Sequence, residues 1–232
     1  MLILIFIVVI AIGGVYFLYN SNDIKTVNKN FSVESFEQIK VDNSIDNIRL
    51  VTGDRYSVSY TGQEKLEPSV KVKNGILTID SPERSITING SIFNVKKLKQ
   101  ELIIEMPKQE LKYLSIDTSN GNISADHLEV QKGKIDTSNG SINIKNLVMK
   151  NEFEIDTSNG TVKVGKTNAA GYDLSTSNGH ITVEGKNKSD EFEKNTSAEN
   201  VLSIDTSNGN IYVNWLYTNR VVDIMSMKKE AD

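Results

Sequence analysis

Five copies of one hexapeptide constrain the fold of this chain more than any other feature. The glycines that end the copies are about 19–20 residues apart until a longer connection precedes the last one, a spacing typical of solenoid coils. Near-identity at such a period predicts a repeat architecture. The copies are Ile116–Gly121, Ile135–Gly140, Ile155–Gly160, Leu174–Gly179 and Ile204–Gly209.

Each copy combines a strand pattern with a turn. Apolar and polar residues alternate on both sides of the glycine, which predicts half-buried strands. The inward face is predicted to carry Ile116, Thr118, Asn120, Ile123 and Ala125, and the outward face Asp117 and Ser119. Asn-Gly readily adopts positive φ and reverses the chain. Structural turns are therefore predicted at Asn120-Gly121, Asn139-Gly140, Asn159-Gly160, Asn178-Gly179 and Asn208-Gly209.

Two arrangements fit this local pattern. Two-residue hairpins would place Thr118 opposite Ile123, but a hairpin does not require the repeated Thr and Ser. Stacking of equivalent residues at a strand spacing of about 4.7–4.9 Å explains the near-identity better, because Thr can then pair with Thr and Asn can form an amide ladder. We predict an all-β fold, a single-stranded β-solenoid with coils of about 19–20 residues. A hairpin meander, barrel or propeller remains the alternative.

The N-terminus carries a long apolar run. Residues 2–18 are apolar or glycine apart from Tyr16, which approaches the length of about 20 residues needed to cross a bilayer. We predict one transmembrane helix at residues 1–19 as an uncleaved anchor. A cleavable signal peptide is the alternative, although no basic residues precede the run. Taken alone, Lys25 and Lys29 after the run would place the rest of the chain in the cytoplasm.

The remaining chain divides by the regularity of its repeats. Two polar segments, 89–100 and 185–200, depart from the period and are predicted to be protruding loops. Trp215 and Tyr217 are predicted to cover the last coil. The expected organisation is a linker at 20–30, a degenerate repeat half at 31–110, a regular repeat half at 111–217, and a C-terminal cap and tail at 218–232.

Composition excludes several kinds of chemistry. A net charge of −4 without a basic cluster argues against nucleic acid as a partner, and the absence of cysteine excludes thiolate sites. His127 and His180 are the two near-neutral bases, and neither belongs to a catalytic motif. No catalytic or cofactor-binding residue is therefore predicted, and the chain is not expected to be an enzyme.

A stacked arrangement would align Asp117, Asp136 and Asp156 in one column of like charges. Hydrogen bonds from neighbouring Thr and Ser hydroxyls or turn amides can satisfy these carboxylates. The alternative is Ca²⁺ in the column, with the three aspartates as the candidate ligands, since hard cations favour carboxylate oxygen. Ser175 replaces Asp in the fourth copy and is expected to interrupt the column.

The pattern as a whole resembles the bacterial putative-adhesin family, a group of β-strand-repeat domains of unknown function that includes the membrane-anchored LiaG-like proteins. The resemblance covers most of residues 31–217. Its marks are Phe36-x-x-Ile39-x-Val41, the strand Leu102-Ile-Ile-Glu-Met-Pro107, and Leu114-Ser-Ile-Asp-Thr-Ser-Asn-Gly-Asn-Ile123. The resemblance implies a β-helix-like domain outside the cytoplasmic membrane, commonly in envelope-stress contexts, and it outweighs the two lysines. It implies no settled biochemical activity.

These features together predict a single-pass cell-membrane protein with an extracytoplasmic β-domain. The domain is expected to act as an adhesin-like binding or scaffolding module at the cell envelope, with an envelope polymer or a membrane protein as its partner. The alternative is a carbohydrate-active β-helix enzyme that acts on envelope or extracellular polysaccharide, because some β-helical enzymes use clustered aspartates.

Overall fold

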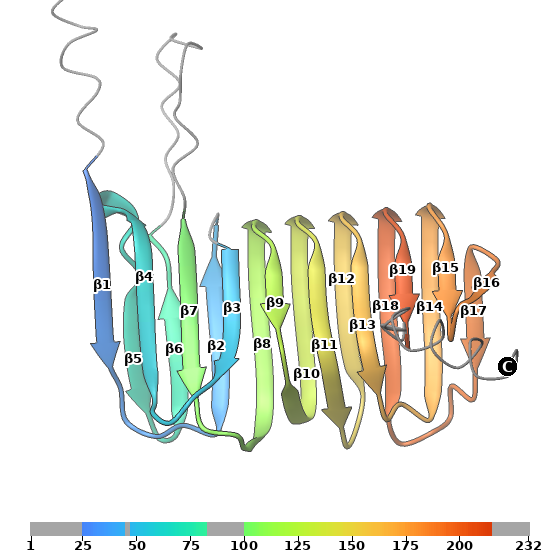
Figure 1. Cartoon of the computed structure of the whole chain (residues 1–232), viewed down its shortest axis with the longest axis horizontal. Helices are drawn as coiled ribbons and strands as arrows, with labels where there is room; N and C mark the ends of the chain where they lie inside the picture. Colours follow the sequence, from blue (N-terminus) through green and yellow to red (C-terminus); the bar gives the residue numbers. More distant parts are fainter. Residues whose placement is uncertain (1–24, 45–46, 83–99, 215–232) are drawn as a thin grey trace, which may run out of the picture.

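The computed structural model describes residues 25–44, 47–82 and 100–214 (Figure 1). The all-β prediction is confirmed, and the short 3₁₀ turn η1 (Glu64–Leu66) is the one helical element of this part. Within it, no helix has the length and apolar character needed to cross a bilayer. The predicted anchor at 1–19, Trp215, Tyr217 and the tail lie outside the described residues.

The strands fall into two rows that follow one long axis (Figure 1). The N-terminal strands are β1 (Thr26–Ser32), β2 (Gln38–Asn43), β3 (Asn47–Thr52), β4 (Ser57–Gln63), β5 (Ser69–Lys73), β6 (Ile76–Asp80) and β7 (Glu101–Met106). The repeats form β8 (Glu110–Asn120), β9 (Ile123–Ala125), β10 (Leu128–Asn139), β11 (Ile142–Met149), β12 (Phe153–Asn159), β13 (Val162–Thr167), β14 (Gly171–Asn178), β15 (Ile181–Val183), β18 (Val201–Asn208) and β19 (Ile211–Val213). Two short strands, β16 (Lys186–Lys188) and β17 (Glu191–Lys194), separate the last two repeats.

Equivalent residues of the repeats pair with one another in parallel. Ile135 of β10 pairs with Ile116 of β8 on one side and with Ile155 of β12 on the other. The strands after the turns form the second row, in which Ile142 pairs with Ile123 and Val162. Because β8 and β9 pair with other coils and not with each other, the hairpin alternative is wrong for these repeats. The coils stack in a solenoid-like manner.

The order of the coils in space differs from their order in the chain. The fifth coil, β18 and β19, lies between the third coil (β12, β13) and the fourth (β14, β15), as Figure 1 shows. At the other end, β2 lies between β6 and β8, and β3 lies between β7 and β9. A solenoid wound in strict chain order is therefore the wrong description of both ends.

Antiparallel strands close the ends of the stack. β17 pairs with β14 and β16 pairs with β15, so the segment predicted as a protruding loop at 185–200 instead covers the last coil. The charged residues of β17 suggested a loop, but Phe192 of this strand packs beside Tyr172 and holds the strand against β14. At the opposite end β1 pairs with β4, and β1 begins at Thr26, inside the segment predicted as a linker at 20–30.

A continuous aliphatic core runs between the two rows of strands. Ile116, Ile135 and Ile155 are at most 1% exposed, and the threonines of the repeats are buried beside them. Asn120, predicted to face inward, is exposed at the last position of β8. The rows therefore bury aliphatic residues and threonine, and they leave Asp, Ser and Asn of each repeat outside.

Candidate functional site

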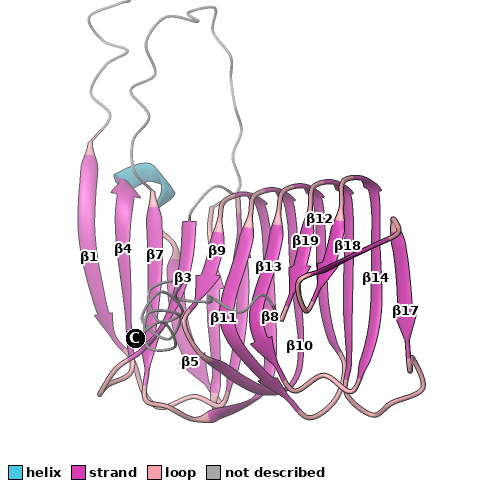
Figure 2. Ribbon diagram, turned by 45° about the vertical axis from the view of Figure 1, so that its right-hand side comes forward, coloured by secondary structure: helices cyan, strands magenta, loops and turns pink. Residues whose placement is uncertain are grey.

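The turns of the five repeats lie in a row along one long edge of the molecule (Figure 2). Their asparagines form an amide ladder of four hydrogen bonds, in which the Nδ2 of one asparagine donates to the Oδ1 of the asparagine on the neighbouring coil at 3.0 Å. The spatial order is Asn120, Asn139, Asn159, Asn208 and Asn178. The ladder therefore follows the stack and not the chain.

The glycine that follows each ladder asparagine was predicted to adopt positive φ, but its role is different. Positive φ is found at Asn74-Gly75, in the hairpin between β5 and β6, and at Gly185, but not at the five turn glycines. At the turns, a Cβ on Gly140 would overlap the carbonyl oxygen of Gly121, and one on Gly160 would overlap that of Gly140. Close approach of successive backbones, rather than backbone conformation, therefore excludes a side chain at these positions.

Buried threonine hydroxyls occupy the inner side of the same edge. The hydroxyl of Thr157 donates to the carbonyl oxygen of Gly140 at 3.3 Å, and that of Thr176 donates to Gly209 at 2.9 Å. Thr206 makes the equivalent bond to Gly160 at 3.3 Å. At these three turns Thr and Gly therefore fix the separation of adjacent coils, whereas the buried hydroxyls of Thr118 and Thr137 make no hydrogen bond with the described residues.

The predicted aspartates share one column, and the column is longer than predicted. Its outward carboxylates pair in register across six strands, and Ser175 stands after the last of them and does not interrupt them. The spatial order is Asp80, Asp42, Asp117, Asp136, Asp156, Asp205 and Ser175. Asp80 and Asp42 were not predicted, although Leu77-Thr-Ile-Asp80 matches the pattern of Leu114-Ser-Ile-Asp117.

The electrostatics of this aspartate column vary along its length. Partial burial, followed by the charges of Asp136 and Asp42, raises the pKa of Asp117. Further along, Lys134 Nζ lies 3.4 Å from Asp136 Oδ2 and 3.0 Å from Asp156 Oδ2. The hydrogen bond to Asp156 raises the pKa of Lys134 well above its usual range. Two of the three proposed Ca²⁺ ligands, Asp136 and Asp156, thus contact the ammonium group of Lys134, a residue that was not predicted. In the described part, no three acidic or histidine side chains form a group that could bind a metal ion.

A second exposed column runs parallel to the aspartates. Its members are Ser119, Ser138, Ser158, Ser207 and Ser177, one from each repeat, and all are exposed. Strand geometry sets the spacing of the residues in each column at about 4.7–4.9 Å. Aspartate (Ser175 in the fourth repeat), serine and asparagine therefore form a regular polar surface over the five repeats, which we call the repeat face.

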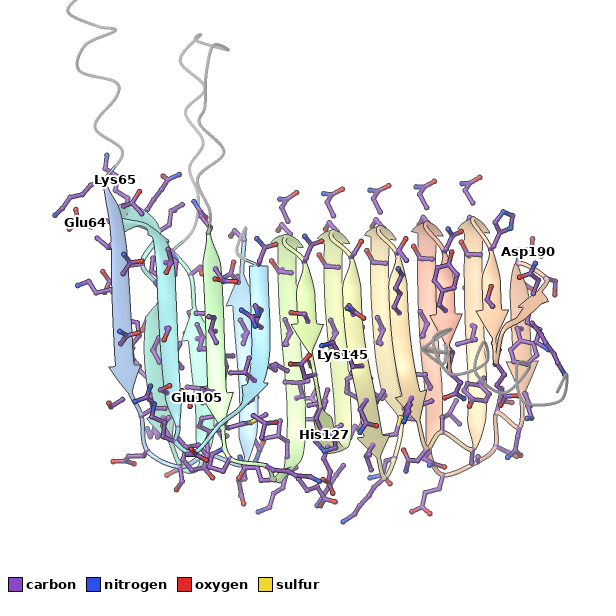
Figure 3. The ribbon with its side chains drawn as sticks, in the orientation of Figure 1. Glu64, Lys65, Glu105, His127, Lys145 and Asp190 are labelled. Atoms are coloured by element: carbon purple, nitrogen blue, oxygen red, sulfur yellow. The ribbon has the colours of Figure 1, made fainter. Side chains whose placement is uncertain are left out.

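The two histidines lie apart from each other. His127, between β9 and β10, has its Nδ1 2.9 Å from Asn146 Nδ2 and its Nε2 3.6 Å from Glu129 Oε2, far from the row of turns (Figure 3). His180 follows the turn after β14, where it is exposed. Neither histidine joins the aspartate column.

Two other carboxylates have lowered pKa values and structural partners. Hydrogen bonds from Ser57 and then Arg55 lower the pKa of Glu105, and bonds from Lys150 and then Gln131 lower that of Glu110. Each pair joins residues that are distant in sequence, such as Ser57 Oγ and Glu105 Oε2 at 2.8 Å. Register between strands creates these contacts, which link the elements of the scaffold.

Comparisons with known proteins agree with this architecture. A family model described as Toastrack DUF4097 matches residues 36–214, which confirms the predicted resemblance. Curated protein sequences contain no match. A solved structure named "putative cell adhesion protein" from Clostridium sporogenes has a TM-score of 0.54 at 15% identity, with 82% of this chain and 98% of that chain covered.

A second solved structure, named "putative adhesin", from Bacteroides fragilis, has a TM-score of 0.36 at 15% identity and covers 82% of this chain and 97% of its own. A third, named "putative lipid binding protein", from Parabacteroides distasonis, has a TM-score of 0.30 at 12% identity and covers 82% and 98%. At these identities the first comparison shows a shared fold. The names of these three structures refer to adhesion and to lipid binding.

Proposed function

We propose that this chain, which belongs to the Toastrack DUF4097 family, is an adhesin-like binding or scaffolding module that uses the repeat face as its contact surface. The observation that carries the proposal is the regular outward array of aspartate, serine and asparagine on four stacked coils, which a fifth coil continues with Ser175 in place of the aspartate. The aspartates pair in register from Asp117 to Asp205, and the exposed serines and asparagines follow the same order.

Such an array suits a partner that is itself repetitive. Each short polar side chain supplies a weak contact, and many equivalent contacts on one rigid surface raise avidity without any single strong site. Stacked coils hold the contacts at a fixed spacing, so the partner does not have to order the surface on binding. An envelope polymer with regularly placed cationic or hydroxyl groups fits this surface, and a membrane protein docked along it is the alternative partner.

The proposed location is the outer side of the cytoplasmic membrane. The apolar run at residues 2–18 supports a single-pass anchor, and the tyrosines that flank its end suit a membrane interface. A module held near the membrane can scaffold other envelope components, including those of an envelope-stress response. Full-length protein should sediment with membranes after a carbonate wash, and protease added to wall-stripped cells should digest the β-domain.

A binding series tests the function of the repeat face. Full-length protein in detergent is mixed with purified cell-envelope polymer, and Asp117, Asp136 and Asp156 are changed to Asn one after another. Affinity should fall in steps of similar size, whereas Asp190→Asn, an exposed change at the cap (Figure 3), should leave it unchanged. Equal binding by the triple variant would reject the repeat face as the contact surface. Glycan cleavage that disappears with one single substitution would instead support a carbohydrate-active enzyme.

A further inference from the structure

The amide ladder has one end at which its protective contacts stop. Asn178 belongs to the last coil of the stack, and its Nδ2 donates to Asn208 Oδ1 at 3.0 Å. No donor from the described residues reaches Asn178 Oδ1, and the backbone N–H of Gly179 has no acceptor among them. The end of the ladder therefore has a free acceptor and a free backbone amide next to each other.

The strands that cover the last coil leave this turn open. β17 pairs with β14 only from Tyr172 to Ser175, and β16 pairs with β15 only from Ile181 to Val183. The backbone N–H of Thr176 donates to Asp190 at 2.9 Å, and the turn at 177–180 lies beyond that bond. Figure 2 shows β14 at the edge of the row of turns.

Interior members of the ladder are held on both sides. Asn139, Asn159 and Asn208 each donate one ladder hydrogen bond and accept another. The amide N–H of the glycine that follows each of them donates to the next coil, at 3.1 Å for Gly140 and Gly160 and at 3.2 Å for Gly209. Both the side chain and the following backbone nitrogen are therefore engaged.

The asparagine side chain and the backbone nitrogen of the following glycine are the two groups that react in a known reaction of Asn-Gly sequences. The deprotonated backbone nitrogen of the glycine attacks Cγ of the asparagine, the N–Cγ bond forms, the bond from Cγ to the side-chain nitrogen breaks, and ammonia leaves. Water then adds to one of the two carbonyls of the cyclic imide, and ring opening yields aspartate or isoaspartate. Glycine favours ring closure because it has no Cβ beside the attacking nitrogen.

We infer that Asn178 is a site of spontaneous deamidation and that the stacked coils protect Asn139, Asn159 and Asn208 from the same reaction. At Asn178 the nucleophilic nitrogen has no acceptor among the described residues. The side chain is restrained only through Nδ2, which donates to Asn208 Oδ1 at 3.0 Å and to the Ser207 carbonyl oxygen at 3.4 Å. At an interior position the glycine amide must leave the neighbouring coil and the side chain must leave the ladder. Conversion replaces the terminal donor by a carboxylate, so the last bond of the ladder is lost and one negative charge is added beside the aspartate column.

The test compares all interior members with the end of the ladder in one sample. Full-length protein is incubated at mildly alkaline pH, and the peptides that contain each turn are quantified by mass spectrometry together with enzymatic isoaspartate detection. Asn178 should convert at least about tenfold faster than the three interior asparagines, because two hydrogen bonds oppose their reaction. In concentrated urea the four rates should become similar. Asn120 is not a control, since residues 45–46 beside it are outside the described part.

Two results would overturn the inference. One is an interior rate in the folded protein that equals or exceeds the rate at Asn178. The other comes from the variant Asn178→Ser. This substitution should abolish the fast conversion and leave the interior rates unchanged, because the backbone N–H of Gly209 still donates to the backbone oxygen of residue 178. Persistence of a fast phase elsewhere in the ladder of this variant would show that the end of the stack does not determine the site.

Discussion

The Ser175 hydroxyl donates a hydrogen bond to the Asp205 carboxylate, although the two residues are 30 positions apart in the chain. This contact identifies the junction at which the fifth coil enters between the third and the fourth. Serine at this position ends the aspartate column with a donor. The substitution that looked like an interruption in the sequence is therefore a termination in the structure.

Ser175→Asp tests this termination. The new carboxylate would lie directly opposite Asp205 and beside Glu191, which pairs with residue 175 from the other side. Like charges opposite each other and the lost hydrogen bond should lower the free energy of unfolding by about 1 kcal/mol at low salt. Urea unfolding measures the loss, and high salt should reduce it. Ser175→Asn is the uncharged control, and equal stability of the two variants at low salt would contradict the repulsion.

The role of the turn glycines leads to a second prediction. Gly140→Ala should lower the free energy of unfolding by about 3 kcal/mol, because even one methyl group meets the carbonyl oxygen of Gly121 from the adjacent coil. Gly185→Ala should cost about 1 kcal/mol, because its φ is +71° but nothing lies near its Cβ position. Melting temperature and urea unfolding compare the two. If Gly185→Ala is the more damaging change, backbone conformation and not coil spacing would be the dominant constraint.

The same dipeptide shows what could and could not be predicted from the sequence. Asn74-Gly75 and Asn139-Gly140 are identical in letters, yet Asn74 and Gly75 have positive φ in a hairpin, whereas Gly140 does not. The local preference of Asn-Gly for positive φ accounts for Asn74-Gly75, whereas only the stacking of coils explains why residue 140 is a glycine. Near-identical repeats did predict in-register pairing, because each position gains the same partners on every coil.

Coil order and capping were the parts that sequence reasoning missed. Equivalent repeats offer one another almost the same ladder, so the pattern does not state whether β12 pairs with β14 or with β18. The cap was missed because β16 and β17 contain mostly charged and polar residues, and Phe192 alone marks an inward position. Edge strands commonly carry such charges, which oppose further strand pairing.

Lys134 supports a third prediction about the aspartate column. Its ammonium contacts Asp136, Glu154 and Asp156, so Lys134→Gln should leave adjacent carboxylates without their cation. We expect a loss of about 0.5–1 kcal/mol, the size of an exposed ion-pair network, and a partial recovery in high salt. Because the folded-state pKa of Lys134 is raised, its contribution is present at every pH below the unfolded-state value and disappears only as pH rises through the higher folded value.

A simple ion pair provides the control for this lysine. Lys132 lies 3.3 Å from Glu152, and both side chains are more than half exposed. Lys132→Gln should change the free energy of unfolding by no more than a few tenths of a kcal/mol. Urea unfolding at two ionic strengths compares the variants. Equal effects of the two substitutions would show that the column gains no specific stabilisation from Lys134.

Asp117 supports the last prediction, which concerns pH. Its folded-state pKa is raised, first by burial and then by Asp136 and Asp42, so the folded protein binds this proton more tightly than the unfolded chain does. Stability therefore falls as pH rises through the folded-state pKa, and the cost disappears below the unfolded-state value of about 3.9. Asp117→Asn should raise the free energy of unfolding by about 0.2–1 kcal/mol at neutral pH, and the gain should vanish near pH 4.

Comparison at each pH is needed because other carboxylates act in the opposite direction. Glu105 and Glu110 have lowered pKa values, so they stabilise the fold above their unfolded-state pKa and lose this contribution as pH falls through the folded values. The difference between Asp117→Asn and the wild type cancels these effects, since both proteins retain the two glutamates. Asp126→Asn, outside the column and paired with Lys145 at 2.6 Å, is the control and should not stabilise the protein. An Asp117→Asn gain that stays constant from neutral to acidic pH would attribute the effect to packing of the amide and not to the relief of charge repulsion.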